Sequence, residues 1–107
     1  MPLKKASVAG GIDRDTLSGT GTLTSIPGDT APVVIVADNP SRLGCSVWND
    51  AAGTLLLLCS GSGKAGPDNF SVALNKNDYF ECPFGYQGEV QGVWLTAGGF
   101  ARVTEYT

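Results

Sequence analysis

The stretch RLGCSVWNDAAGTLLLLC, residues 42–59, decides the fold because it holds two strand patterns with a turn between them. Residues 42–48 alternate apolar and polar side chains, the period of a strand with one buried face. Residues 49–53 are of the types that favour turns. The leucines at 55–58 are too few for a helix and predict a strand buried on both faces. We expect the two strands to pair as a hairpin.

The rest of the chain from residue 20 repeats this pattern of short apolar runs between Gly, Pro, Asn and Asp. The further expected strands are 22–26, 33–36, 70–74, 79–82, 89–95 and 100–106. Residues 60–69 carry no pattern and are expected to form a flexible, exposed loop. About eight strands with turns roughly 8–12 residues apart are typical of a sandwich or barrel. The sequence therefore predicts an all-β protein: an antiparallel, jelly-roll-like β-sandwich of about eight short strands.

Length and composition exclude several classes of function. A chain of 107 residues is enough for one domain, and 15 Gly with 6 Pro favour many turns. The chain has no His, which excludes Ser–His–Asp and Cys–His catalysis and any His-ligated metal. Its net charge of −3 argues against a nucleic-acid partner. No apolar run approaches the ~18 residues of a membrane span, so no membrane partner is expected.

Residues 1–19 differ from the rest and are interpreted as an N-terminal arm, with the β-sandwich domain at 20–107. The arm carries five of the chain's 17 charged residues (7 basic plus 10 acidic), and its apolar residues follow no sustained period. No apolar segment follows its two lysines, so it is not expected to be a secretion signal. A frayed terminus without a role is the alternative. If the arm binds a neighbouring subunit, the expected contact residues are Leu3, Lys4, Lys5, Val8 and Ile12.

The sequence shows no pattern typical of a catalytic, cofactor or metal site. Cys45, Cys59 and Cys82 each fall within an expected strand, with no Lys or Arg within two residues to activate a thiolate. They lack zinc-site spacing, and an odd count does not suggest a disulfide framework. We expect three inert, buried thiols in a protein made in a reducing cytoplasm, and infer no disulfide. An Asp-Arg-Asp triplet at 13–15 and a Gly-Ser-Gly-Lys segment at 61–64 lack the spacing of calcium and phosphate loops.

Most of the aromatic residues are expected in the core, because a small sandwich needs large side chains to fill it. The turn at 84–86, Phe-Gly-Tyr, is the exception. Aromatic side chains in a tight turn between Pro83 and Gly88 cannot all point inward. Phe84 and Tyr86 are therefore candidates for contact with another subunit, and local packing is the alternative.

Three segments together resemble small structural proteins of tailed bacteriophages. They are LGCSVWND (43–50) followed by the leucine strand, DYFECPFGYQG (78–88), and VW (93–94) with GFARVTE (99–105). The resemblance covers roughly residues 20–107. It implies a β-sandwich virion component of the head decoration (cement) type, without catalytic residues or cofactors. Cysteines at these three positions depart from the family pattern.

Proteins of this type commonly sit as homotrimers on the outer capsid surface and join neighbouring major capsid protein subunits. The resemblance therefore implies a virion location after synthesis in the host cytoplasm, with the major capsid protein and further copies of this chain as partners. Two alternatives stay open. One is another virion component, such as a head fibre base, a head–tail joining protein or a tail protein. The other is a host-surface glycan-binding module, which requires several exposed aromatic side chains on one face. An enzyme is not expected.

Overall fold

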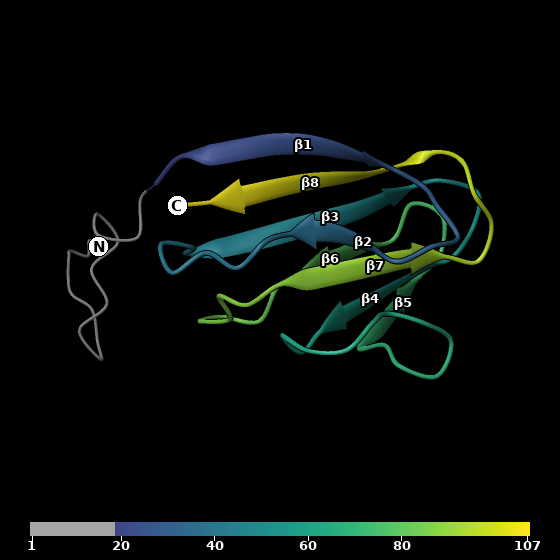
Figure 1. Ribbon diagram of the computed structural model, residues 1–107. Helices are drawn as coiled ribbons and strands as arrows, with labels where there is room; N and C mark the ends of the chain where they lie inside the picture. The colour runs from purple at the N-terminus through teal and green to yellow at the C-terminus, as the bar shows by residue number, and fades with distance from the viewer. Residues whose placement is uncertain (1–18) are drawn as a thin grey trace.

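Eight strands and no helix make up residues 19–107, the part of the chain that the computed structural model describes (Figure 1). The strands are β1 (Gly21–Pro27), β2 (Val33–Val36), β3 (Gly44–Asp50), β4 (Leu55–Cys59), β5 (Val72–Leu74), β6 (Tyr79–Glu81), β7 (Val90–Trp94) and β8 (Phe100–Tyr106). Each overlaps a strand that the apolar pattern predicts, so the all-β class is confirmed.

The strands form two four-stranded antiparallel sheets, in the orders β1-β8-β3-β6 and β2-β7-β4-β5. The chain crosses from one sheet to the other at every connection except the one between β4 and β5. Figure 1 shows β1 at the upper margin of the molecule, beside β8. This strand order is that of a jelly roll, in which two Greek keys share a double sheet. The predicted jelly-roll-like sandwich is therefore confirmed.

The predicted hairpin of β3 and β4 is wrong. β3 pairs with β6 and β8, whereas β4 pairs with β5 and β7 in the other sheet. Both strands bring apolar residues to the core, and the sandwich core needs them on opposite walls. The short link at 51–54 therefore carries the chain across the end of the core, although its turn residues also suit a hairpin.

The core lies between the sheets and is built from the inward residues of both. Val47 and Ala101 come from one sheet, and Leu55, Leu57 and Trp94 from the other; each is at most 1% exposed. Alternation along each strand places these residues on the inner face and their neighbours on the outer face.

A second apolar cluster covers the outer face of β4 and β7. Leu56, Leu58 and Val93 pack there with Ala65 of the long loop. The side chain of Gln91 anchors this loop: its Nε2 donates to the Gly63 carbonyl at 2.8 Å, and its Oε1 accepts from the Ala65 N–H at 3.0 Å. The leucine strand is thus buried on both faces, as predicted. The expectation of an exposed loop holds for most of residues 60–69 but is wrong for Ala65, which is buried.

Candidate functional site

Large apolar side chains gather on the outer face of the β1-β8-β3-β6 sheet. Because alternate residues of a strand share a face, the strand register places five exposed residues on this side. We call this set the aromatic face; its members, with their exposed fractions, are Leu23 (79%), Trp48 (45%), Tyr79 (60%), Phe100 (40%) and Tyr106 (45%). Exposed apolar side chains that share one face are a feature by which interaction surfaces are recognised, so this face is the candidate site.

Trp48 belongs to β3, an interior strand of this sheet. The register places it directly opposite Tyr79 on β6 and directly opposite Arg102 on β8. Side chains directly opposite one another on neighbouring strands have Cβ atoms about 4.5–5.5 Å apart, close enough for contact. The three side chains therefore form a strip across three strands.

Several interactions hold Arg102 in place on this face. Its Nε donates to Asp50 Oδ2 at 2.9 Å, and its Nη1 donates to Ser25 Oγ at 2.9 Å. Its guanidinium carbon lies 4.6 Å from the centre of the Phe100 ring, a cation–π arrangement. The pair with Asp50 is exposed and adds little stability. Its effect, together with the bond to Ser25, is to hold the planar guanidinium in one orientation.

The aromatic face suits binding by surface burial. Trp, Tyr and Arg are the residues that most often dominate the energy of protein interfaces. Here they occupy adjacent positions on a sheet, where the backbone is held by strands on both sides of β3 and β8. A rigid surface loses little conformational entropy on binding.

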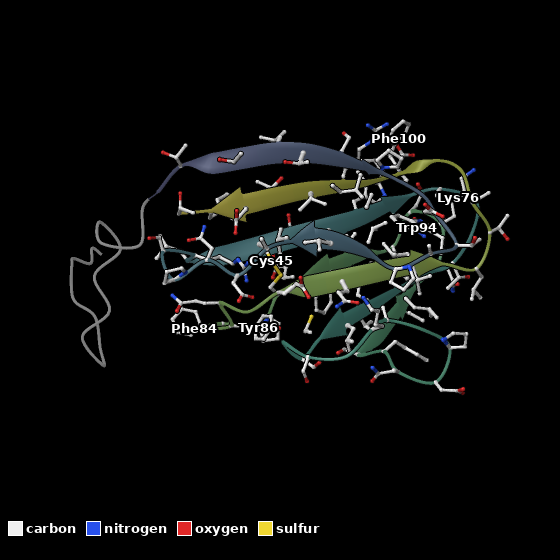
Figure 2. All side chains as sticks on the ribbon, in the orientation of Figure 1. Cys45, Lys76, Phe84, Tyr86, Trp94 and Phe100 are labelled. Carbon is white, nitrogen blue, oxygen red and sulfur yellow. A yellow bond between two sulfur atoms is a disulfide. The ribbon has the colours of Figure 1, made fainter. Side chains whose placement is uncertain are left out.

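The two aromatic residues of the predicted contact turn differ in exposure. Phe84 is 77% exposed, whereas Tyr86 packs against the core and its hydroxyl donates to the Glu89 carbonyl at 2.6 Å. Figure 2 shows Phe84 at one end of the sandwich and Phe100, a member of the aromatic face, at the other. A partner role for Phe84 and Tyr86 stays a prediction. The expected arm contacts (Leu3, Lys4, Lys5, Val8, Ile12) lie outside the described residues.

Sequence reasoning missed the aromatic face because it assigned most of these aromatic residues to the core. Trp94 is indeed buried, but Trp48, Tyr79 and Phe100 point outward. The alternation around Val47 already contained this information for Trp48, since neighbours of an inward residue face outward. The same alternation puts Tyr79 on one face with Glu81 and Phe100 on one face with Arg102, so the sequence held a comparable indication for both.

Two of the three cysteines are joined, contrary to the expectation of unpaired thiols. Cys45 and Cys82 form a disulfide between β3 and the residue after β6, with Cα atoms 5.3 Å apart. The Cys82 N–H also donates to the Cys45 carbonyl at 2.9 Å, which continues the pairing of the two strands. The 37-residue separation hides this proximity, which only the strand pairing creates.

Cys59 is the free cysteine, and it is partly buried. Burial raises the pKa of its thiol, and the positive charge of Arg42 only partly opposes this effect. The thiol form therefore predominates at neutral pH, and a thiol is a poor nucleophile. The expected burial of this cysteine is met only in part, and its lack of reactivity stays a prediction.

The described residues offer little else for chemistry. Residues 19–107 contain no group of three or more Cys, Asp and Glu side chains placed to hold a metal ion. A hollow of about 370 Å³ is lined by Ala37, Asp38, Gly61 and Glu89. Within the same range, no helix has the length and apolar character needed to cross a membrane.

Comparison with known proteins adds no relative: no protein-family model, curated protein or solved structure matches this chain.

Proposed function

We propose that this protein is a bacteriophage virion structural protein of the capsid decoration (cement) type. It binds the outer surface of the head and stabilises it by contacts between neighbouring major capsid protein subunits. The observation that carries the proposal is the aromatic face, with Trp48 between Tyr79 and Arg102 on a rigid sheet. The sequence resemblance to small phage structural proteins supplies the partner.

A structural role agrees with the surface chemistry of the domain. The aromatic face can bury apolar area against a flat subunit surface, and the ordered Arg102 can pair with a carboxylate or carbonyl there. Many copies on one symmetric shell act together, so a modest affinity per contact is sufficient. Homotrimers on the capsid surface are the assembly that the resemblance implies, and no cofactor is required.

Binding to capsids that lack this protein tests the aromatic face. We expect Trp48→Ala to weaken capsid binding by about 30-fold or more, the effect of losing an interface hot spot. Leu95→Ala is the matched control, because Leu95 is 56% exposed but follows β7 in the other sheet. It should bind as the unmodified chain does. Equal binding of both variants, with unchanged thermal stability, contradicts docking through this face.

Removal of residues 1–19 tests the arm separately. If the arm attaches the domain to its neighbour, the truncated chain stays folded but no longer occupies capsids. Full occupancy by the truncated chain contradicts the arm as the attachment device. Copy number then separates decoration from the other virion positions: hundreds of copies per particle indicate decoration, whereas about a dozen or fewer indicate a head fibre base, a head–tail joining protein or a tail protein.

A second candidate function is glycan binding on a host surface. The observation that favours it is that several exposed aromatic side chains share one face, beside the polar groups of Asp50, Glu81 and Arg102. Aromatic rings can stack on sugars while neighbouring polar groups accept or donate hydrogen bonds. A glycan array probed with the full chain tests this function: signal that Trp48→Ala removes supports it, and a blank array rejects it.

A further inference from the structure

Within residues 19–107, the backbone of β1 has a partner strand on one side only. Thr20 and Thr107 exchange two hydrogen bonds, and the Gly28 N–H donates to the Gly99 carbonyl at 2.9 Å. The register between these two points is regular, so even-numbered residues of β1 point their N–H and C=O groups toward β8. Gly21, Leu23 and Ser25 therefore point theirs away from the sheet, and we call these groups the free edge. β1 pairs with β8 alone among the strands.

The free edge differs from the other three sheet edges of the described domain. β5 and β6 are only three residues long, and β6 carries Glu81. β2 has four residues and a register shift between Val34 and Val36. Short strands, charges and bulges are the devices by which proteins prevent edge-to-edge pairing. β1 has none of them: it is seven residues long, regular and uncharged, and its Pro27 stands only at the last position.

We propose that the free edge of β1 pairs antiparallel with the free edge of a second copy of this chain. In the register centred on Leu23, Leu23 faces its own counterpart and Gly21 faces Ser25 of the other copy. This register uses every outward N–H and C=O group of the three residues in each chain. A shift by two residues in one direction brings Pro27 into the ladder, where it offers no N–H. A shift by two residues in the other direction places Ser25 opposite Gly19, which precedes the first residue of β1.

The chemistry of β1 fits a second copy as the occupant. Two identical strands meet without like-charge repulsion, because β1 carries no charged residue. Leu23, at 79% exposure the most exposed large apolar residue described, gains an apolar neighbour across the two-fold axis. The two aromatic faces then lie on the same side of one continuous eight-stranded sheet. An isologous contact relates two copies only, so in a particle that carries trimers it would join one trimer to the next.

Sedimentation velocity of the full chain over a range of concentrations tests this proposal. We expect the unmodified protein to associate reversibly in pairs as its concentration rises. In Leu23→Pro the equilibrium should shift toward the unpaired form. That substitution removes one edge-facing N–H from each chain without removing a bond to β8, and should raise the dissociation constant about tenfold or more. Leu23→Lys, which retains the N–H but places two like charges opposite each other, should also weaken association, and added salt should partly restore it. Circular dichroism checks that both variants are folded.

Thr104→Lys is the matched control, because Thr104 lies on the same outward face opposite Leu23 but belongs to an interior strand. The Thr104→Lys variant should associate in pairs as strongly as the unmodified chain. The proposal is overturned if the unmodified chain shows no two-fold association at any concentration. It is equally overturned if folded Leu23→Pro and Leu23→Lys associate as strongly as the unmodified chain, since the contact then lies elsewhere. Neither result bears on capsid binding through Trp48, so the two proposals fail separately.

Discussion

The indole Nε1 of Trp94 donates a 3.1 Å hydrogen bond to Oδ1 of Asn49, and this bond joins the two sheets inside the core. Both residues are at most 1% exposed. The Asn49 amide nitrogen donates to the carbonyls of Gly53 and Leu74, each at 2.9 Å. One side chain thus connects β3, the link to β4, the end of β5 and the tryptophan of β7.

Substitution of Asn49 should strongly destabilise the domain. Asn49→Ala removes the side-chain partner of the Trp94 N–H, of the buried Leu74 carbonyl and of the part-buried Gly53 carbonyl. We expect a loss of about 3 kcal/mol or more in the free energy of unfolding. Urea denaturation followed by tryptophan fluorescence measures it. Asn69→Ala is the control, because the single side-chain bond of Asn69 is exposed, and it should cost under about 1 kcal/mol. A comparable loss in both variants would contradict a special role for the buried amide.

Arg42 and Glu105 should matter far more for stability than the second ion pair, Arg102 and Asp50. Arg42 is 2% exposed; its Nε donates to Glu105 Oε2 at 2.9 Å, and its remaining nitrogens donate to backbone carbonyls. Glu105→Gln removes the charge partner of a buried guanidinium; because Glu105 itself is partly exposed, we expect a cost of about 1.5–3 kcal/mol. Arg102→Ala breaks an exposed pair and should cost at most about 1 kcal/mol. Urea denaturation of the two variants compares them directly, and equal losses would refute this ranking.

Reduction of the Cys45–Cys82 disulfide should lower stability without unfolding the domain at room temperature. The bond closes a chain separation of 37 residues, for which the chain-entropy model gives a stabilisation of about 4 kcal/mol. Denaturation midpoints with and without dithiothreitol measure the effect. Cys59→Ser is the control and should show the same difference as the unmodified chain, since Cys59 takes no part in the bond. An unchanged midpoint on reduction would mean that the disulfide is absent or contributes nothing.

Tyr86 should make stability depend on pH in the alkaline range. Burial is the main cause that raises the pKa of its phenol, and the nearby Cys59 adds to it. The unfolded chain ionises this tyrosine first, near the usual pKa of about 10. The contribution of Tyr86 is therefore fully present below that pKa and is lost as the pH rises from it toward the higher folded value. Urea denaturation at pH 8, 9 and 10.5 measures the slope, which Tyr86→Phe should reduce; an identical slope in Tyr86→Phe would assign it to other groups.

The strand pattern was predictable because it depends on neighbours in the chain. Alternation in residues 42–48, the β-branched run at 33–36 and the Gly and Pro between them are local preferences, and each led to a strand at nearly the right place. The pairing of β3 was not predictable in the same way. The turn residues after Trp48 suit both a hairpin and a crossing between sheets, and only the burial of both strands selects the crossing.

The candidate site, too, was predictable from the sequence only where it depends on neighbouring residues. The alternation around Val47 placed Trp48 outside, but the meeting of Trp48 with Tyr79 and Arg102 depends on strands far apart in sequence. The sequence did not indicate that the Arg42 guanidinium is buried in a network of hydrogen bonds. Its partners come from Ala37, the loop at 86–88 and β8, which are not its neighbours in the chain pattern.

The sequence by itself determined the all-β class, the strands and the absence of histidine chemistry, because composition and residue period act locally along the chain. Only the tertiary structure decided which strands are neighbours. The strand order places Cys45 beside Cys82 and makes Asn49, an expected turn residue, a buried link between the sheets. Among residues 19–107 it also gives β1 a partner strand on one side only. The physical reason is that sandwich packing satisfies apolar burial and hydrogen bonding over the whole molecule at once, and several pairings of the same strands satisfy each local preference equally well.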